Sequence, residues 1–179
     1  GKQPDHHPIP QEQINEILIE HAKAGKTVVR LKGGDPYVFG RGGEELIACR
    51  DAGVDVEVVP GVTSAIAVAA AAGIPVTHRG VSRGFSVVTG HEELASLPTR
   101  SDHTIVLLMG VKRLAQTVAE MIAAGHDEAT PVAVIERGFS PTQRTTIGTL
   151  ATIGELASEA KSPAVVVIGD VVRLATPAS

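Results

Sequence analysis

The chain is poor in aromatic residues. Its 179 residues include no tryptophan, one tyrosine and three phenylalanines, so its core must be built from aliphatic side chains. The apolar content is 43%, and valine-rich runs of this kind are typical of strands buried on both faces, as in parallel sheets. No run of about 18 apolar residues occurs, so the sequence predicts no membrane-spanning helix.

Cysteine, basic charge and metal-ligand clusters are scarce as well. The single cysteine, Cys49, excludes an internal disulfide and fits a reducing compartment, from which we predict a cytoplasmic protein. Cys49 falls in a helical pattern, where a small buried apolar role is favoured over a nucleophile. The net charge of −4 gives no basic footprint for nucleic acid. His6 and His7 are adjacent, with no third ligand spaced nearby, so we expect no metal site.

Apolar periodicity alternates between helical and strand patterns, which predicts an α/β fold. A polar stretch around 91–102 suggests two subdomains, 1–86 and 87–179. The strand over 143–149 is expected to be antiparallel, because the connection before it is short. We expect helices over 11–24, 44–53, 62–72, 111–124 and 150–159, strands over 27–31, 54–59, 84–90, 104–109, 131–136, 143–149 and 164–169, and extended chain over 171–174.

The most informative stretch is the glycine-rich segment 32–45. It follows an expected strand and enters an expected helix, which is where ligands bind in open α/β sheets. Its five glycines allow close approach of the backbone to a ligand. It is neither a Walker loop nor Gly-x-Gly-x-x-Gly, and it lacks the combination of a Gly-x-Gly loop with the acidic residue expected about 20 residues later, so an NAD domain is disfavoured. The plain alternative is a tight turn with surface glycines.

As a complete string, Arg30-Leu-Lys-Gly-Gly-Asp-Pro-Tyr-Val-Phe-Gly-Arg-Gly-Gly-Glu-Glu45 resembles the signature of the uroporphyrinogen-III C-methyltransferases, in the tetrapyrrole methylase family. Further similarity lies at 1–15, 58–64, 73–79, 88–91, 109–110 and 141–144. The resemblance implies a two-subdomain fold, with a parallel sheet in a partial first subdomain and a mixed sheet in the second. It also implies a homodimer.

The implied reaction is methylation of uroporphyrinogen III at two pyrrole carbons, giving precorrin-2 for sirohaem or cobalamin. S-adenosylmethionine is the implied methyl donor, and S-adenosylhomocysteine the product. The resemblance places cofactor contacts at Gly33, Gly34, Asp35, Val38, Thr63, Ser64, Met109 and Gly138.

A polycarboxylate substrate calls for guanidinium and ammonium groups. The resemblance makes Lys2 a catalytic proton donor, and Arg41 and Arg79 the preferred substrate contacts. Further basic candidates are Arg30, Lys32, Arg83 and Arg144.

One departure from the family pattern is clear. Family members begin with a strand, a Gly-x-Gly-Pro-Gly-Asp loop and an aspartate viewed as a base, none of which is present here. We therefore expect an N-terminally truncated chain whose base lies upstream of Gly1. Two alternatives stay open: a sibling precorrin methyltransferase, and a catalytically incomplete fragment that binds cofactor or mediates dimerisation.

Overall fold

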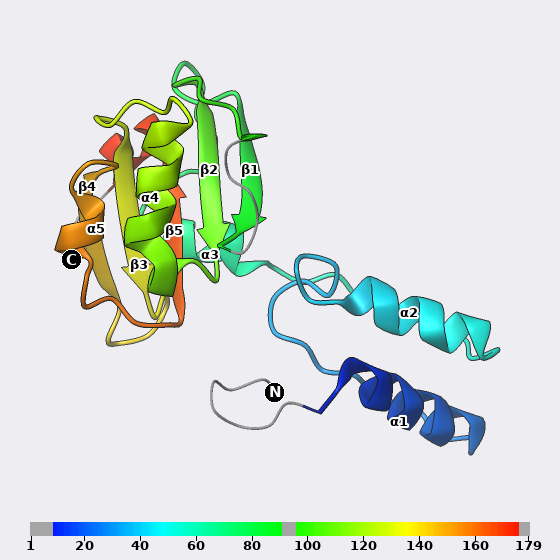
Figure 1. Ribbon diagram of the computed structural model, residues 1–179. Coiled ribbons are helices and arrows are strands. Elements are labelled where there is room, and N and C mark those ends of the chain that lie inside the picture. The colour runs from blue at the N-terminus through cyan, green and yellow to red at the C-terminus, as the bar shows by residue number, and fades with distance from the viewer. Residues whose placement is uncertain (1–8, 91–95, 176–179) are drawn as a thin grey trace. The chain divides into compact units, whose positions relative to one another are not determined.

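A computed structural model describes residues 9–90 and 96–175 of the chain (Figure 1). Contacts divide it into two compact units, Gly1–Thr63 and Ser64–Ser179, and each is described by itself. The predicted subdomain boundary at 86/87 falls inside the first strand of the second unit, and it stays a prediction about the fold of the family.

The described part of the first unit, residues 9–63, holds two helices, α1 (Gln11–Lys23) and α2 (Gly42–Asp51), which pack against each other. Both confirm helices expected from apolar spacing. Pro10 precedes α1, a position where a missing N–H is tolerated, and Gly25 follows it with a φ of 77°. Arg41 precedes α2 with a left-handed φ of 58°.

The predicted strands over 27–31 and 54–59 were wrong for the described part of this unit, residues 9–63, which contains no strand. The predicted parallel sheet of the first subdomain is therefore not formed there. A strand requires a hydrogen-bonded neighbour. These runs have none, and their apolar side chains lie uncovered, with Val29, Leu31 and Val59 exposed by 82%, 84% and 72%.

The second unit is built on a five-stranded mixed sheet with the order β1-β2-β5-β3-β4 (Figure 1). Only β1 and β2 pair in parallel, and the other three pairings are antiparallel, including the predicted one between β3 and β4. The strands are β1 (Gly84–Thr89), β2 (His103–Leu108), β3 (Pro131–Glu136), β4 (Arg144–Thr149) and β5 (Ala164–Ile168), all close to the predicted ranges.

The sheet separates two apolar cores. Alternate residues of β2 show this, because Ile105 and Leu107 belong to one core and Val106 and Leu108 to the other. The first core is covered by α4 (Leu114–Ala123), which crosses the near face of the sheet in Figure 1, and by α5 (Ile153–Leu156). The second is covered by α3 (Ser64–Ala71) and the 3-10 helix η3 (Asp170–Leu174).

Three element predictions in this unit need adjustment. The segment 171–174 is helical within η3 and not extended, because Gly169 turns the chain at the end of β5 with a φ of 136°. The expected helix over 111–124 begins as a 3-10 turn, η2 (Val111–Arg113). The expected helix over 150–159 is reduced to the single turn of α5. Across the described residues no helix combines the length and apolar character that crossing a membrane requires.

The close approach of α3 to the sheet depends on small side chains. Ala69 is fully buried, whereas Ala70 is exposed on the same helix. We expect Ala69→Leu to lower the free energy of unfolding by about 1–3 kcal/mol, because added methylene groups overpack a filled core. Ala70→Leu is the matched control and should leave the urea midpoint nearly unchanged. Equal midpoints for the two variants would contradict tight packing of α3.

Candidate functional site

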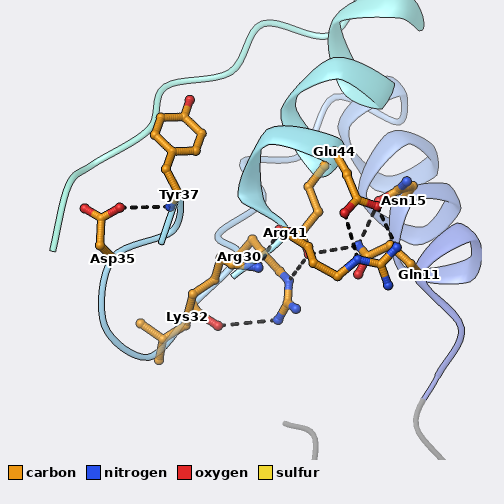
Figure 2. Close-up of polar contacts among 10 residues, drawn as sticks. Gln11, Asn15, Arg30, Lys32, Asp35, Tyr37, Arg41 and Glu44 are labelled. Atoms are coloured by element: carbon orange, nitrogen blue, oxygen red, sulfur yellow. Dashed lines mark hydrogen bonds and ion pairs between the residues drawn. The ribbon is translucent and has the colours of Figure 1, made fainter. Parts of the chain in front are cut away.

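The glycine-rich loop of the first unit is organised by Asp35. Its carboxylate accepts hydrogen bonds from the backbone N–H of Tyr37 at 2.8 Å (Figure 2) and from that of Gly61 at 3.0 Å. One side chain therefore joins the loop to the Pro60-Gly61 turn, 26 residues later. A Cβ at Gly61 would overlap the carbonyl oxygen of Gly34, so the two backbones meet where only glycine fits.

The environment of Asp35 favours its charged form. Hydrogen bonds from the amides of Gly61 and then Tyr37 lower the pKa of Asp35 below its usual value, outweighing its partial desolvation. An ionised carboxylate offers about four acceptor positions, and the two amides use two of them. Asp35 can therefore accept further hydrogen bonds from a ligand hydroxyl or ammonium group.

A buried carboxylate, Glu45, fixes the basic residues at the start of the loop. It is 6% exposed and accepts hydrogen bonds from Gln11 Nε2 at 3.1 Å, Arg30 Nε at 3.2 Å and Lys32 Nζ at 2.9 Å. Burial alone would raise the pKa of Glu45, but Lys32, Gln11 and Arg30 together lower it. Arg30 and Lys32, considered above as substrate contacts, thus have a structural partner.

Arg41 and Arg79 differ in their surroundings. The Arg41 guanidinium forms a two-point pair with Glu44, at 2.9 Å through Nε and 2.6 Å through a terminal nitrogen (Figure 2). Arg79 lies in the second unit, in the exposed turn closed by the bridge between His78 and Ser82. Within the described parts of the chain, the Arg79 side chain makes no hydrogen bond or ion pair, so it is the one free to bind a carboxylate.

In the second unit, three residues with a strained backbone lie at one edge of the sheet, the edge formed by the carboxyl ends of β2 and β3. Met109 follows the end of β2, and Arg137 and Phe139 follow the end of β3; all three have positive φ, of 54°, 48° and 64°. β2 and β3 both run antiparallel to β5, so their carboxyl ends share this edge. Positive φ in residues other than glycine costs about 1–3 kcal/mol each and clusters at ligand sites.

The same edge presents exposed apolar side chains next to a tightly packed backbone. Met109 and Phe139 are exposed by 57% and 71%. Between Arg137 and Phe139, a Cβ at Gly138 would come within 2.8 Å of the Val68 side chain in α3, so the loop rests directly on that helix. Gln143 holds it there by donating from Nε2 to the carbonyl oxygen of Ala71 at 3.1 Å.

Glu136, the last residue of β3, anchors this edge. It is 2% exposed, accepts from Arg144 Nε at 2.8 Å and from the Lys161 amide at 2.9 Å, and lies 3.7 Å from Arg137. Burial would raise the pKa of Glu136, but the Lys161 amide and the Arg144 charge lower it. Arg144 is therefore held by a buried carboxylate, like Arg30 and Lys32.

The remaining predicted residues fall in both units. Gly33, Gly34, Asp35 and Val38 share one loop, and the amide of Val38 donates to the carbonyl oxygen of Asp35 at 3.3 Å. Thr63 directly precedes α3, and Ser64 is its first residue. Met109 and Gly138 lie at the strained edge of the sheet. Lys2 lies outside the described residues.

Sequence reasoning missed the two buried carboxylates. Glu45 was part of the matched string and Glu136 ended a predicted strand, but neither was considered as an organising group. Each of the two glutamates lies near basic residues in the sequence, and this proximity was the available signal that it pairs with them. The positive φ values of Arg137 and Phe139 were not predicted either. The glycine between these two residues, Gly138, was the available indication of an unusual backbone conformation there.

Comparison with known proteins gives a consistent family. The model of the Tetrapyrrole (Corrin/Porphyrin) Methylases matches residues 1–154. An S-adenosyl-L-methionine-dependent uroporphyrinogen III methyltransferase of Methanosarcina barkeri is 51% identical over 97% of this chain and 72% of that protein. Siroheme synthase 1 of Klebsiella pneumoniae is 48% identical over 97% of this chain, which spans only 38% of that protein.

Solved structures agree with this. Uroporphyrin-III C-methyl transferase from Thermus thermophilus, complexed with S-adenyl homocysteine, has a TM-score of 0.80 and 42% identity, covering 92% of this chain and 75% of that one. Cobalt precorrin-4 methyltransferase also has a TM-score of 0.80, at 27% identity, and covers 92% of this chain and 72% of that one.

The close contact at Gly61 can be tested by adding one methyl group. In Gly61→Ala, the Cβ forces the turn away from Gly34, so the Asp35 carboxylate loses one of its two amides. We expect exchange of the Tyr37 amide, measured by NMR, to accelerate by about tenfold as the loop opens locally. Gly43→Ala is the control, because a Cβ there meets nothing within 4 Å. Unchanged Tyr37 exchange in both variants would show that the loop does not depend on this contact.

Proposed function

Because the chain belongs to the tetrapyrrole (corrin/porphyrin) methylases, we propose that it carries S-adenosylmethionine-dependent C-methylation of uroporphyrinogen III, with precorrin-2 as product. The observation that carries the proposal is the Asp35 loop, which combines a charged carboxylate with close glycine backbone inside the segment most similar to this family. Sirohaem or cobalamin synthesis is the pathway this product would feed. We further propose a cytoplasmic homodimer.

The residues present fit such a methyl donor. A Cβ at Gly33 would meet nothing within 4 Å, so a ligand can lie against the backbone there. Asp35 keeps acceptor positions for an ammonium or ribose hydroxyl group. In the first unit we propose contacts from Gly33, Gly34, Asp35, Val38 and Thr63. From the second unit we propose contacts from Ser64, Met109 and Gly138.

For methyl transfer, the main task of the protein is to align the methyl donor with the carbon that accepts the methyl group. The donor supplies a methyl group from a sulfonium and leaves as a neutral thioether, so little acid catalysis is needed at the leaving group. Binding both partners in line can contribute about 7–11 kcal/mol to the lowering of the barrier. The pyrrole carbon forms the new C–C bond as the C–S bond of the donor breaks, and the macrocycle then loses a proton from another ring position, since the methylated carbon carries none. We propose Lys2 as a group that moves a proton in this reaction.

The proposal is tested by binding and turnover together. Calorimetry should detect S-adenosylhomocysteine binding to the 179-residue chain, and Asp35→Asn should weaken it by about tenfold or more, because a charged acceptor is lost. Asp51→Asn, at the exposed end of α2, is the matched control and should bind normally. Normal binding by Asp35→Asn would contradict the assigned role of Asp35.

Turnover separates the alternatives. Uroporphyrinogen III and precorrin-2 are each offered, with the methyl donor, to the 179-residue chain and to the natural translation product that contains it. Methylation of uroporphyrinogen III supports the proposal, and methylation of precorrin-2 alone would identify a sibling enzyme. Binding without turnover by the 179 residues, with turnover by the translation product, would identify a catalytically incomplete fragment.

Substrate carboxylates provide a further prediction. We propose that Arg41 and Arg79 contact them, and Arg79 is the cleaner test because its side chain has no partner within the described residues. Arg79→Ala should raise the Kd for uroporphyrin III about 3- to 10-fold, as expected for loss of one charge-assisted hydrogen bond. Binding is followed by the fluorescence of the porphyrin. Arg113→Ala, an exposed cation of the same unit, is the control, and equal effects of both would indicate general charge attraction only.

A further inference from the structure

In the second unit, the side chain of Gln143 joins the loop between β3 and β4, residues 137–143, to the end of α3. Its Oε1 accepts a hydrogen bond from the backbone N–H of Phe139 at 2.9 Å, and its Nε2 donates one to the carbonyl oxygen of Ala71 at 3.1 Å. A backbone N–H only donates and a carbonyl oxygen only accepts, so a single orientation of the Gln143 amide satisfies both partners. One side chain thus links two segments that lie 72 residues apart in the sequence.

The link to α3 is made at a helix end that needs a partner. The last four carbonyl groups of an α-helix have no acceptor role within the helix. Ala71 is the last residue of α3, so Gln143 supplies a donor to one of these carbonyl groups. Three residues earlier, the Val68 side chain lies against Gly138, where a Cβ would come within 2.8 Å of it. Residues three apart share a helix face, so the loop meets one face of α3 at two points.

The loop held in this way has an unfavourable backbone conformation. Arg137 and Phe139 have positive φ, of 48° and 64°. The Phe139 side chain is also 71% exposed, so its own burial does not compensate for this conformation. Such a backbone persists only where the surrounding contacts determine it, and it is typical of ligand sites. Gln143 provides one of these contacts, because it accepts directly from the amide of Phe139.

The rest of the loop is closed by its own hydrogen bonds. Arg137 Nε donates to the carbonyl oxygen of Thr142 at 3.0 Å. The Ser140 amide donates to the carbonyl oxygen of Arg137, and the Gln143 amide to that of Ser140, both at 3.0 Å. The loop is therefore a compact element, and the side chain of Gln143 and the backbone of Gly138 place it against α3.

We propose that Gln143 is a positioning residue of the methyl-donor site, which fixes the Gly138 backbone relative to α3. This inference rests on the proposed function, in which Gly138 and Ser64, the first residue of α3, both contact the methyl donor. Gln143 acts through the loop backbone and not by touching the donor. With both contacts already in place, less ordering of the protein is needed when the donor binds, and this raises the affinity.

The first test is calorimetric titration of the 179-residue chain with S-adenosylhomocysteine. Gln143→Met removes both hydrogen bonds at similar side-chain volume, and we expect the Kd to rise about 3- to 10-fold. Thr152→Val is the matched control, because it removes a hydroxyl group that accepts from the Thr149 amide at 2.9 Å. Thr149 pairs with Pro131 at the opposite edge of the sheet, so this variant should unfold more easily but keep the parent Kd.

A second variant ties the affinity to the two hydrogen bonds themselves. In Gln143→Glu, the protonated carboxyl group can donate to Ala71 and accept from Phe139, whereas the carboxylate only accepts. The carbonyl oxygen of Ala71 favours the protonated form. We therefore expect the Kd of Gln143→Glu, divided by that of the parent chain, to fall as the pH is lowered from about 8 to about 5. A ratio that stays constant over this range would contradict the assigned role of these hydrogen bonds.

Three further results would overturn the proposal. Equal Kd values for Gln143→Met and the parent chain would show that the donor site does not depend on Gln143. Equal weakening by Gln143→Met and Thr152→Val would show that the affinity follows general stability. Absence of S-adenosylhomocysteine binding by the parent chain would contradict the proposed function as well, and it is distinguishable from the other results because it precedes any substitution.

Discussion

Burial of the central strands on both faces is the constraint on which the second unit depends. β2, β5 and β3 each contribute alternate side chains to two separate cores, so no face of these strands can be polar. Both faces then need apolar covers, which α4 and α5 provide on one side and α3 and η3 on the other. With both faces occupied, only the two edges formed by strand ends remain for polar chemistry.

The two edges carry different chemistry as a result. At the carboxyl ends of β2 and β3, residues with positive φ lie next to the exposed apolar side chains of Met109 and Phe139. At the opposite edge, His103 and His126 border a pocket of about 240 Å³, and each has one buried ring nitrogen without a hydrogen-bond partner among the described residues.

Sequence reasoning worked where local pattern and tertiary contact agree. The five strands of the second unit were predictable because β-branched runs such as that of β5 are buried by their own neighbours within the unit. The runs over 27–31 and 54–59 have the same composition but no hydrogen-bonded partner in residues 9–63, and partner availability cannot be read from a run itself. Likewise, the position of the glycine-rich segment after an expected strand predicted that Asp35 lies in a ligand-binding loop. That position could not predict that the Gly61 amide, 26 residues later, donates a hydrogen bond to the Asp35 carboxylate.

The buried carboxylates explain why basic residues near the loop cannot all serve a ligand. Leaving Glu45 or Glu136 buried without its cations would be strongly unfavourable, so Arg30, Lys32 and Arg144 are committed to the fold. Asp35 differs from both, because backbone amides and not cations hold its charge. It therefore remains an uncompensated negative group at the loop surface, available to a cationic ligand group. This difference in partner distinguishes Asp35 from the two buried carboxylates, and it supports the proposed role of Asp35 in binding the methyl donor.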